Sequence, residues 1–198
     1  MSRSPSFSKF NITNDEINAL PLHAFDGTVN VIHDTEDLSH VFREISKHRI
    51  VGFDTETKPV FVKGQRHHVA LMQIALPEQV FLVRIKFSGV TSEIVEFLEN
   101  DKILKAGVGV RDDIKALQAL KKFTPAGFVE LADMARNAGL EVESVKKLTA
   151  LLLGFRISKS AQTSNWEADR LDSKQISYAA TDAWVCLNIY RKLAGDLP

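Results

Sequence analysis

Apolar residues recur along this chain at two spacings, and these spacings predict its secondary structure. Six short apolar runs indicate β-strands, and the third and fourth runs, with a proline between them, indicate a hairpin. These runs cover residues 29–33, 50–53, 69–75, 80–85, 103–108 and 128–131. Apolar residues three and four positions apart predict helices, which cover residues 13–20, 35–49, 92–99, 113–122, 144–153 and 173–193.

The order of these elements predicts the fold class. A run of strands, followed by alternating helices and strands, is typical of an α/β domain in which helices cover a mixed sheet. No internal linker or repeat interrupts the pattern. We therefore expect an N-terminal extension over residues 1–27, with a short helix capped by Thr13 and Glu16, and one domain over residues 28–198.

Composition narrows the class of protein. With 198 residues, 44% hydrophobic and 25% charged, the chain can bury a sizeable core, which excludes a disordered or fibrous protein. The 25 basic and 25 acidic residues cancel, which is unlike a general nucleic-acid coat protein. A zero net charge still permits an enzyme whose carboxylates offset a local basic groove.

The cysteine content and the length of the longest apolar runs indicate the cellular compartment of the protein. The single cysteine, Cys186, excludes an internal disulfide and a cysteine-based zinc cluster. No run approaches the roughly 20 apolar residues of a membrane helix, and the N-terminus lacks the apolar core of a secretory signal. These features predict a cytoplasmic protein with no membrane association.

Three segments carry candidate chemistry, although each also has an ordinary structural explanation. Asp54 and Glu56 end an apolar strand on the same face, where they could share a divalent cation or simply face solvent. Tyr178 and Asp182 share a helix face, as do many such pairs without function. Asp113 opens a predicted helix, a position that capping alone favours.

Taken together, these segments have more weight than any one of them alone. Four carboxylates from a strand, a helix start and a C-terminal helix can hold two divalent ions, and a neighbouring tyrosine can orient a water molecule. That combination is typical of phosphodiester hydrolysis assisted by two metal ions.

The same segments resemble a known family. The sequences VGFDTET, AGVGVRDDIKAL and ISYAATDAW resemble the three exonuclease motifs of the DEDD superfamily, tyrosine subtype. This group includes ribonuclease D and the exonuclease domain of the Werner syndrome protein. The resemblance extends over roughly residues 28–195. It implies a ribonuclease-H-like (DnaQ-like) fold with a mixed five-stranded sheet flanked by helices.

The resemblance assigns roles residue by residue. It makes Asp54, Glu56, Asp113 and Asp182 the ligands of two Mg²⁺ or Mn²⁺ ions and Tyr178 the residue that aims the attacking water. Asp112, beside Asp113, is then a helix cap or a neutralising neighbour. Expected substrate-binding residues are Thr55, Phe61, Arg66 and Lys159.

The implied activity is 3′-5′ exonucleolytic hydrolysis that releases nucleoside 5′-monophosphates from a DNA or RNA 3′ end. Two alternatives stay open at this point. One is an RNA-processing exoribonuclease of the ribonuclease D type, and the other is a weakly active nucleic-acid-binding module with the same fold. No attached helicase or accessory nucleic-acid-binding domain is expected in this sequence. The oligomeric state cannot be predicted from it.

Overall fold

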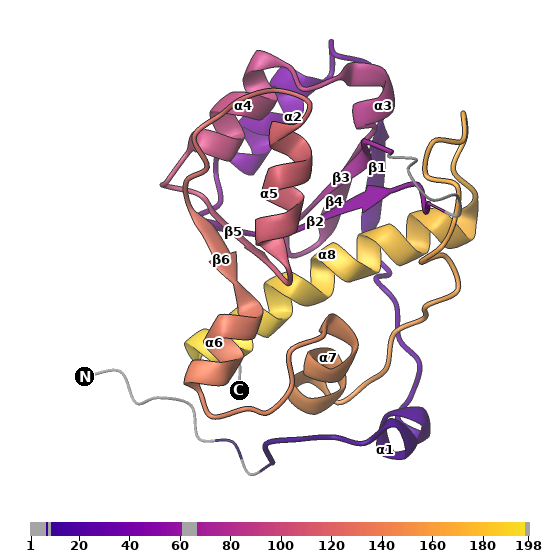
Figure 1. Ribbon diagram of the computed structural model, residues 1–198, viewed down its shortest axis with the longest axis vertical. Helices are drawn as coiled ribbons and strands as arrows, with labels where there is room; N and C mark the ends of the chain where they lie inside the picture. Colours follow the sequence, from indigo (N-terminus) through magenta and orange to yellow (C-terminus); the bar gives the residue numbers. More distant parts are fainter. Residues whose placement is uncertain (1–6, 8, 61–66, 197–198) are drawn as a thin grey trace.

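A mixed six-stranded sheet forms the centre of the computed structural model, which describes residues 7, 9–60 and 67–196 (Figure 1). The strand order is β1-β4-β3-β2-β5-β6, and β3 runs antiparallel to both of its neighbours while the other pairs are parallel. The strands are β1 (Thr28–Ile32), β2 (Ile50–Thr57), β3 (Val69–Ala75), β4 (Gln79–Val83), β5 (Leu104–Gly107) and β6 (Phe128–Glu130).

Helices cover both faces of the sheet (Figure 1). They are α1 (Asn14–Ala19), α2 (Leu38–Ile45), α3 (Ile85–Ser88), α4 (Ser92–Glu99), α5 (Val110–Gln118), α6 (Leu131–Asn137), α7 (Val145–Leu153) and α8 (Ser173–Ala194). Apolar residues of α2, α4 and α5 form one core with the sheet, and α8 crosses the opposite face with α6 and α7 beside it. None of the helices in the described ranges combines the length and the apolar character needed to cross a membrane.

The α/β class and the ribonuclease-H-like fold predicted from the sequence are confirmed, with two differences in detail. All six predicted strand segments enter one sheet, which therefore has six strands and not the five that the family resemblance implied. The helices α3 and α6 were not predicted. Helix α3 has only four residues, and its first residue, Ile85, continues the apolar run of the preceding strand. Helix α6 begins directly after the short strand β6.

Helix α5 begins three residues before the predicted start, and this shift places Asp113 in its first turn. Gly109 adopts a left-handed conformation (φ 79°), which glycine allows at little cost, so the chain turns into the helix directly after β5. The backbone N–H groups of Gly109 and Val110 donate to the carboxylate of Glu130, which also accepts from Ala132 N. One side chain thereby caps both α5 and α6.

Close packing brings α8 against β2. A Cβ on Gly52 would lie 1.9 Å from the carbonyl oxygen of Ala183, so only glycine fits at this crossing. Ala179, Ala180 and Ala183 are buried along the same side of the helix. Small residues on both elements therefore let the middle of α8 lie directly over the end of β2, where the first acidic motif is found.

The described part of the predicted extension packs against the domain. A backbone bridge joins Leu22 to Arg156, and Phe25 N donates to Thr181 Oγ1 over 3.0 Å. The His23 ring contacts the rings of Phe155 and Trp184, with centroids 5.0 Å and 5.7 Å away. Residues 20–25 are therefore attached to α8 one residue before Asp182.

Candidate active site

Three carboxylates converge where α8 crosses the end of β2. Asp54 and Glu56 lie two apart on β2 and face α8, and Asp182 approaches them from that helix. One oxygen from each of these three side chains lies within 4.8 Å of the other two. An all-oxygen donor set of this kind suits a hard divalent cation such as Mg²⁺ or Mn²⁺.

Asp113 joins this group through Thr55. Thr55 Oγ1 donates to Asp113 Oδ1 over 2.5 Å, so the hydroxyl between the two acids of β2 holds the acid of α5. Asp113 lies outside the set whose oxygens are mutually within 4.8 Å. Its neighbour Asp112 points to solvent, with its side chain 88% exposed, and pairs with Lys115 over 3.1 Å. Asp112 does not cap α5, because the N-cap of that helix is Gly109. Of the two roles considered for Asp112, the structure therefore favours that of a neighbour of Asp113 over that of a helix cap.

Burial raises the pKa of every carboxyl in the group, and repulsion by other members of the group adds to this for Asp54 and Glu56. Burial and then the charges of Asp113 and Asp182 hold the pKa of Asp54 well above its ordinary value. Burial, Asp182 and Asp113 raise the pKa of Glu56 to about 8. Burial raises the pKa of Asp182 to about 7, against hydrogen bonding from Tyr178 and the charge of Lys159. Burial raises the pKa of Asp113 to about 6, against the hydrogen bond from Thr55. The residues present therefore fit a cation, which would relieve this repulsion.

These shifts predict how stability depends on pH. Because Glu56 and Asp182 keep their protons in the folded protein up to about pH 8 and 7, and lose them near pH 4 when unfolded, the folded state binds more protons between these limits. The free energy of unfolding of the metal-free protein should then fall, on the order of 3 kcal/mol, as pH rises from 5 to 8. Thermal unfolding across this range in the presence of chelator measures the loss.

Added Mg²⁺ or Mn²⁺ should restore more stability at pH 8 than at pH 5, because the ligands must deprotonate to bind the ion. A thermal midpoint that stays level between pH 5 and 8, and does not respond to either ion, would contradict this assignment of the carboxylates.

A cleft of about 320 Å³ opens beside these acids and contains two lysines, Lys146 and Lys159. Lys159 was predicted as a substrate-binding residue, and Thr55 also lines the cleft with its hydroxyl engaged by Asp113. Lys146, Ser144 and Gln162 were not predicted, because nothing in their local sequence distinguishes them from other exposed polar residues. Phe61 and Arg66, also predicted to bind substrate, lie outside the described residues.

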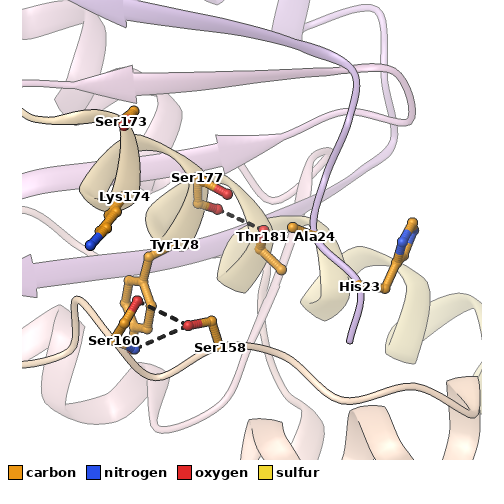
Figure 2. A pocket seen from close by; sticks show the side chains of 9 residues that line it. All are labelled: His23, Ala24, Ser158, Ser160, Ser173, Lys174, Ser177, Tyr178 and Thr181. Atoms are coloured by element: carbon orange, nitrogen blue, oxygen red, sulfur yellow. Dashed lines mark hydrogen bonds between the residues drawn. The ribbon is translucent and has the colours of Figure 1, made fainter. Parts of the chain in front are cut away.

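Tyr178 separates this cleft from a second pocket on its other side. Figure 2 shows its ring facing Ser158 and Ser160, and the second pocket, of about 190 Å³, continues to His23 and Lys174. The two cavities share Tyr178 and Ser158. The lining of the second pocket contains no carboxylate.

Burial and the nearby charges of Asp182 and Glu56 raise the pKa of Tyr178 above its ordinary value, so the phenol stays protonated at neutral pH. The buried ring of Trp166 packs against the ring of Tyr178, with centroids 6.0 Å apart. The phenol is therefore a fixed hydrogen-bond donor beside the acidic group, and it is not a free base.

His67, which follows the first motif, contacts a carboxylate shared with a lysine. His67 Nδ1 lies 3.2 Å from Glu167 Oε1, and Lys58 Nζ lies 3.4 Å from the other oxygen of the same carboxylate. Among the described residues, the group of acidic or histidine side chains placed to share a metal ion is the one formed by Asp54, Glu56 and Asp182.

Comparison with known proteins identifies the family to which this chain belongs. A family model described as 3'-5' exonuclease matches residues 29–198. The mouse bifunctional 3'-5' exonuclease/ATP-dependent helicase WRN is 34% identical over 184 residues, a match that covers 88% of this chain and 13% of the mouse protein. The chain thus spans a small part of that relative's length.

Solved structures share the fold. The EXO domain of Nibbler from Aedes aegypti superposes with a TM-score of 0.77 at 23% identity, covering 88% of this chain and 92% of that domain. Escherichia coli RNase D, described as an exoribonuclease involved in structured RNA processing, gives a TM-score of 0.77 at 20% identity over 85% of this chain and 45% of its own. With a family match that extends from β1 to the C-terminal residue, this chain belongs to the 3'-5' exonucleases, of the DEDD type that its three acidic motifs predicted.

Proposed function

We propose that this protein removes nucleotides one at a time from the 3′ end of single-stranded or frayed nucleic acid and releases nucleoside 5′-monophosphates. The observation that carries the proposal is the convergence of Asp54, Glu56 and Asp182, with the Tyr178 phenol beside them, in a member of the 3'-5' exonuclease family. We assign the activity to residues 28–198, with residues 1–27 as an extension.

Asp54, Glu56, Asp113 and Asp182 would hold two Mg²⁺ or Mn²⁺ ions. Bound divalent ions would supply Lewis-acid chemistry, making a water nucleophilic at neutral pH and offsetting charge on the leaving 3′-oxygen. Asp113 would contribute from the side of Thr55, which orients its carboxylate. The repulsion among these carboxylates in the metal-free protein supports a site that is shaped for cations.

The remaining residues would position the substrate. Tyr178 would donate a hydrogen bond that aims the attacking water, a role that suits its raised pKa. Lys146 and Lys159 line the cleft next to the acids and would attract the phosphates of an incoming strand. Their charges are local, consistent with the zero net charge of the chain.

Two alternatives remain for the substrate and the role. RNA is the alternative substrate, since E. coli RNase D, described as an exoribonuclease involved in structured RNA processing, shares this fold. A weakly active binding module would need one of the four acids to be misplaced, and the three that converge argue against it. A cytoplasmic location stays a prediction from composition.

A digestion experiment separates these possibilities. DNA and RNA strands of matched sequence, labelled at either the 5′ or the 3′ end, are incubated with the protein in Mn²⁺, Mg²⁺ or chelator. We expect a ladder from the 5′-labelled strand, immediate release of labelled mononucleotide from the 3′-labelled strand, and no reaction in chelator. Internal cleavage, or full activity in excess chelator, would refute the proposal.

The adjacent acids of α5 provide a further test. Asp113→Ala removes a buried carboxylate held by Thr55, so we expect the rate to fall by at least about 10²-fold, as for loss of a group worth several kcal/mol. Asp112→Ala removes an exposed surface pair with Lys115 and should change the rate by less than about threefold. Initial rates at saturating Mn²⁺ measure both. The reverse order would assign the second motif to Asp112.

A further inference from the structure

Gln73, in the middle of β3, is a polar side chain buried without a partner. It has no exposed surface, and both its amide nitrogen and its amide oxygen lack a hydrogen bond among the described residues. Most buried side-chain amides in proteins are hydrogen-bonded, because an unpaired buried polar group is costly. An amide in this state beside a candidate active site calls for an explanation.

The register of the sheet places this amide next to Asp54. Gln73 is the antiparallel partner of Asp54 across the β2–β3 pair, and residues directly opposite each other point to the same face with Cβ atoms about 5 Å apart. That separation lies within the reach of a glutamine side chain. On the other side Gln73 is opposite Leu82, so its nearest polar neighbour in the register is the Asp54 carboxylate.

Most residues on this face of the sheet beside Gln73 are apolar, and the same buried cluster contains Trp166, whose Nε1 also lacks a hydrogen-bond partner among the described residues. Leu71, Ala75 and Leu82 of the sheet pack against Ala179, Ala180 and Ala183 of α8 in one buried cluster on this face. An apolar side chain of similar size would fit such a space without leaving any polar atom unpaired. Packing alone therefore does not account for an amide at this position.

We propose that Gln73 is a positioning residue for Asp54, and that its Nε2–H donates to the Asp54 carboxylate when that carboxylate binds a cation. This proposal rests on the proposed function. The Thr55 backbone N–H already donates to Asp54 Oδ1 over 2.9 Å. A second donor from the neighbouring strand fixes the plane of the carboxylate from the opposite side, as outer partners of metal ligands do.

The chain offers a matched control in Thr149. This residue of α7 is also fully buried, its hydroxyl also has no hydrogen-bond partner among the described residues, and it does not line the cleft. Thr149→Val and Gln73→Met each remove one unpaired buried polar group at nearly constant size. They differ in that only Gln73 is paired across the sheet with an acid of the site, so a comparison of the two separates a positioning role from a general effect of burial.

The experiment measures Mn²⁺ affinity by calorimetric titration and thermal unfolding in chelator for the wild-type protein and both variants. We expect both variants to unfold in chelator at or above the wild-type temperature, and only Gln73→Met to bind Mn²⁺ about 10- to 100-fold more weakly. Raising the Mn²⁺ concentration should restore the rate of Gln73→Met towards the wild-type value. Gln73→Leu replaces the methionine variant if that protein does not fold.

Each other outcome has a definite meaning. Unchanged Mn²⁺ affinity in a folded Gln73 variant, or an equal loss in Thr149→Val, would overturn the positioning role while leaving the proposed function in place. A wild-type protein that binds no Mn²⁺ would instead overturn the proposed function, and the role of Gln73 with it.

Discussion

Asp182→Asn is expected to abolish turnover and at the same time to stabilise the metal-free protein. The substitution keeps the shape of the side chain but removes one of the three converging negative charges, so a ligand worth several kcal/mol is lost and the rate should fall by about 10³-fold or more. Single-turnover digestion at saturating Mn²⁺ measures this loss.

Removal of the same negative charge that lowers the rate should stabilise the metal-free protein. Asp182 has a folded pKa of about 7, so at pH 8 its ionised form destabilises the fold relative to the unfolded chain, where its pKa is ordinary. Removing the charge should raise the free energy of unfolding at pH 8 by about 2 kcal/mol, or the midpoint by about 4–8 °C for a chain of this size, and the gain should shrink as pH falls through 7 and vanish only below about pH 4.

Asp169→Asn serves as the control, because that side chain is 92% exposed and its ion pair is with Lys86, away from the acidic group. It should change neither rate nor stability appreciably. An Asp182→Asn protein that retains the wild-type rate, or that is less stable than the wild type in chelator at pH 8, would place the third acidic ligand elsewhere.

Tyr178→Phe is expected to slow the chemical step by about 10²–10⁴-fold while Mn²⁺ and single-strand binding persist. The substitution removes only the hydroxyl, and the ring keeps its contact with Trp166 and its place between the two cavities. If the phenol aims the attacking water, its hydrogen bond matters mainly in the transition state, so the rate constant should change and substrate affinity should not.

The other tyrosine of the chain, Tyr190, also lies on α8 and provides the matched control. Tyr190→Phe should leave the single-turnover rate at its wild-type value. A Tyr178→Phe rate within twofold of wild type, with chemistry shown to limit the reaction, would leave Tyr178 as a packing residue at the edge of the core.

Most of the elements could be predicted because their signals are local. The capping box of Thr13 and Glu16 is formed in α1, and α7 ends at Leu153, the last residue of the helix predicted over residues 144–153. Helices α3 and α6 escaped prediction because they are short and adjoin strands, so neither shows a full helical period. The start of α5 was misplaced because it depends on the cap that Glu130 supplies from β6, a contact between residues about twenty positions apart.

The candidate site was predicted from three motifs, and the structure refines how their residues meet. Asp54, Glu56 and Asp182 converge as expected, whereas Asp113 is connected through the hydroxyl of Thr55. Thr55 was expected to bind substrate, and that expectation stays a prediction. The sequence around Lys146 and Gln73 does not mark either residue as functional. Lys146 resembles any other exposed lysine, and Gln73 lies within an apolar strand.

The sequence by itself therefore determined most of the strands and helices and their order, the α/β class and the set of acids proposed to carry the chemistry, because apolar spacing and motif residues are properties of each segment alone. Only the tertiary structure decided which side chains face one another. The pairing of Gln73 with Asp54 follows from strand register, and the reach of Asp182 to the acids of β2 follows from the contact of Gly52 with Ala183. Both depend on how segments far apart in the chain pack together, and that packing is decided by the burial and close fit of the whole core, which no single segment encodes.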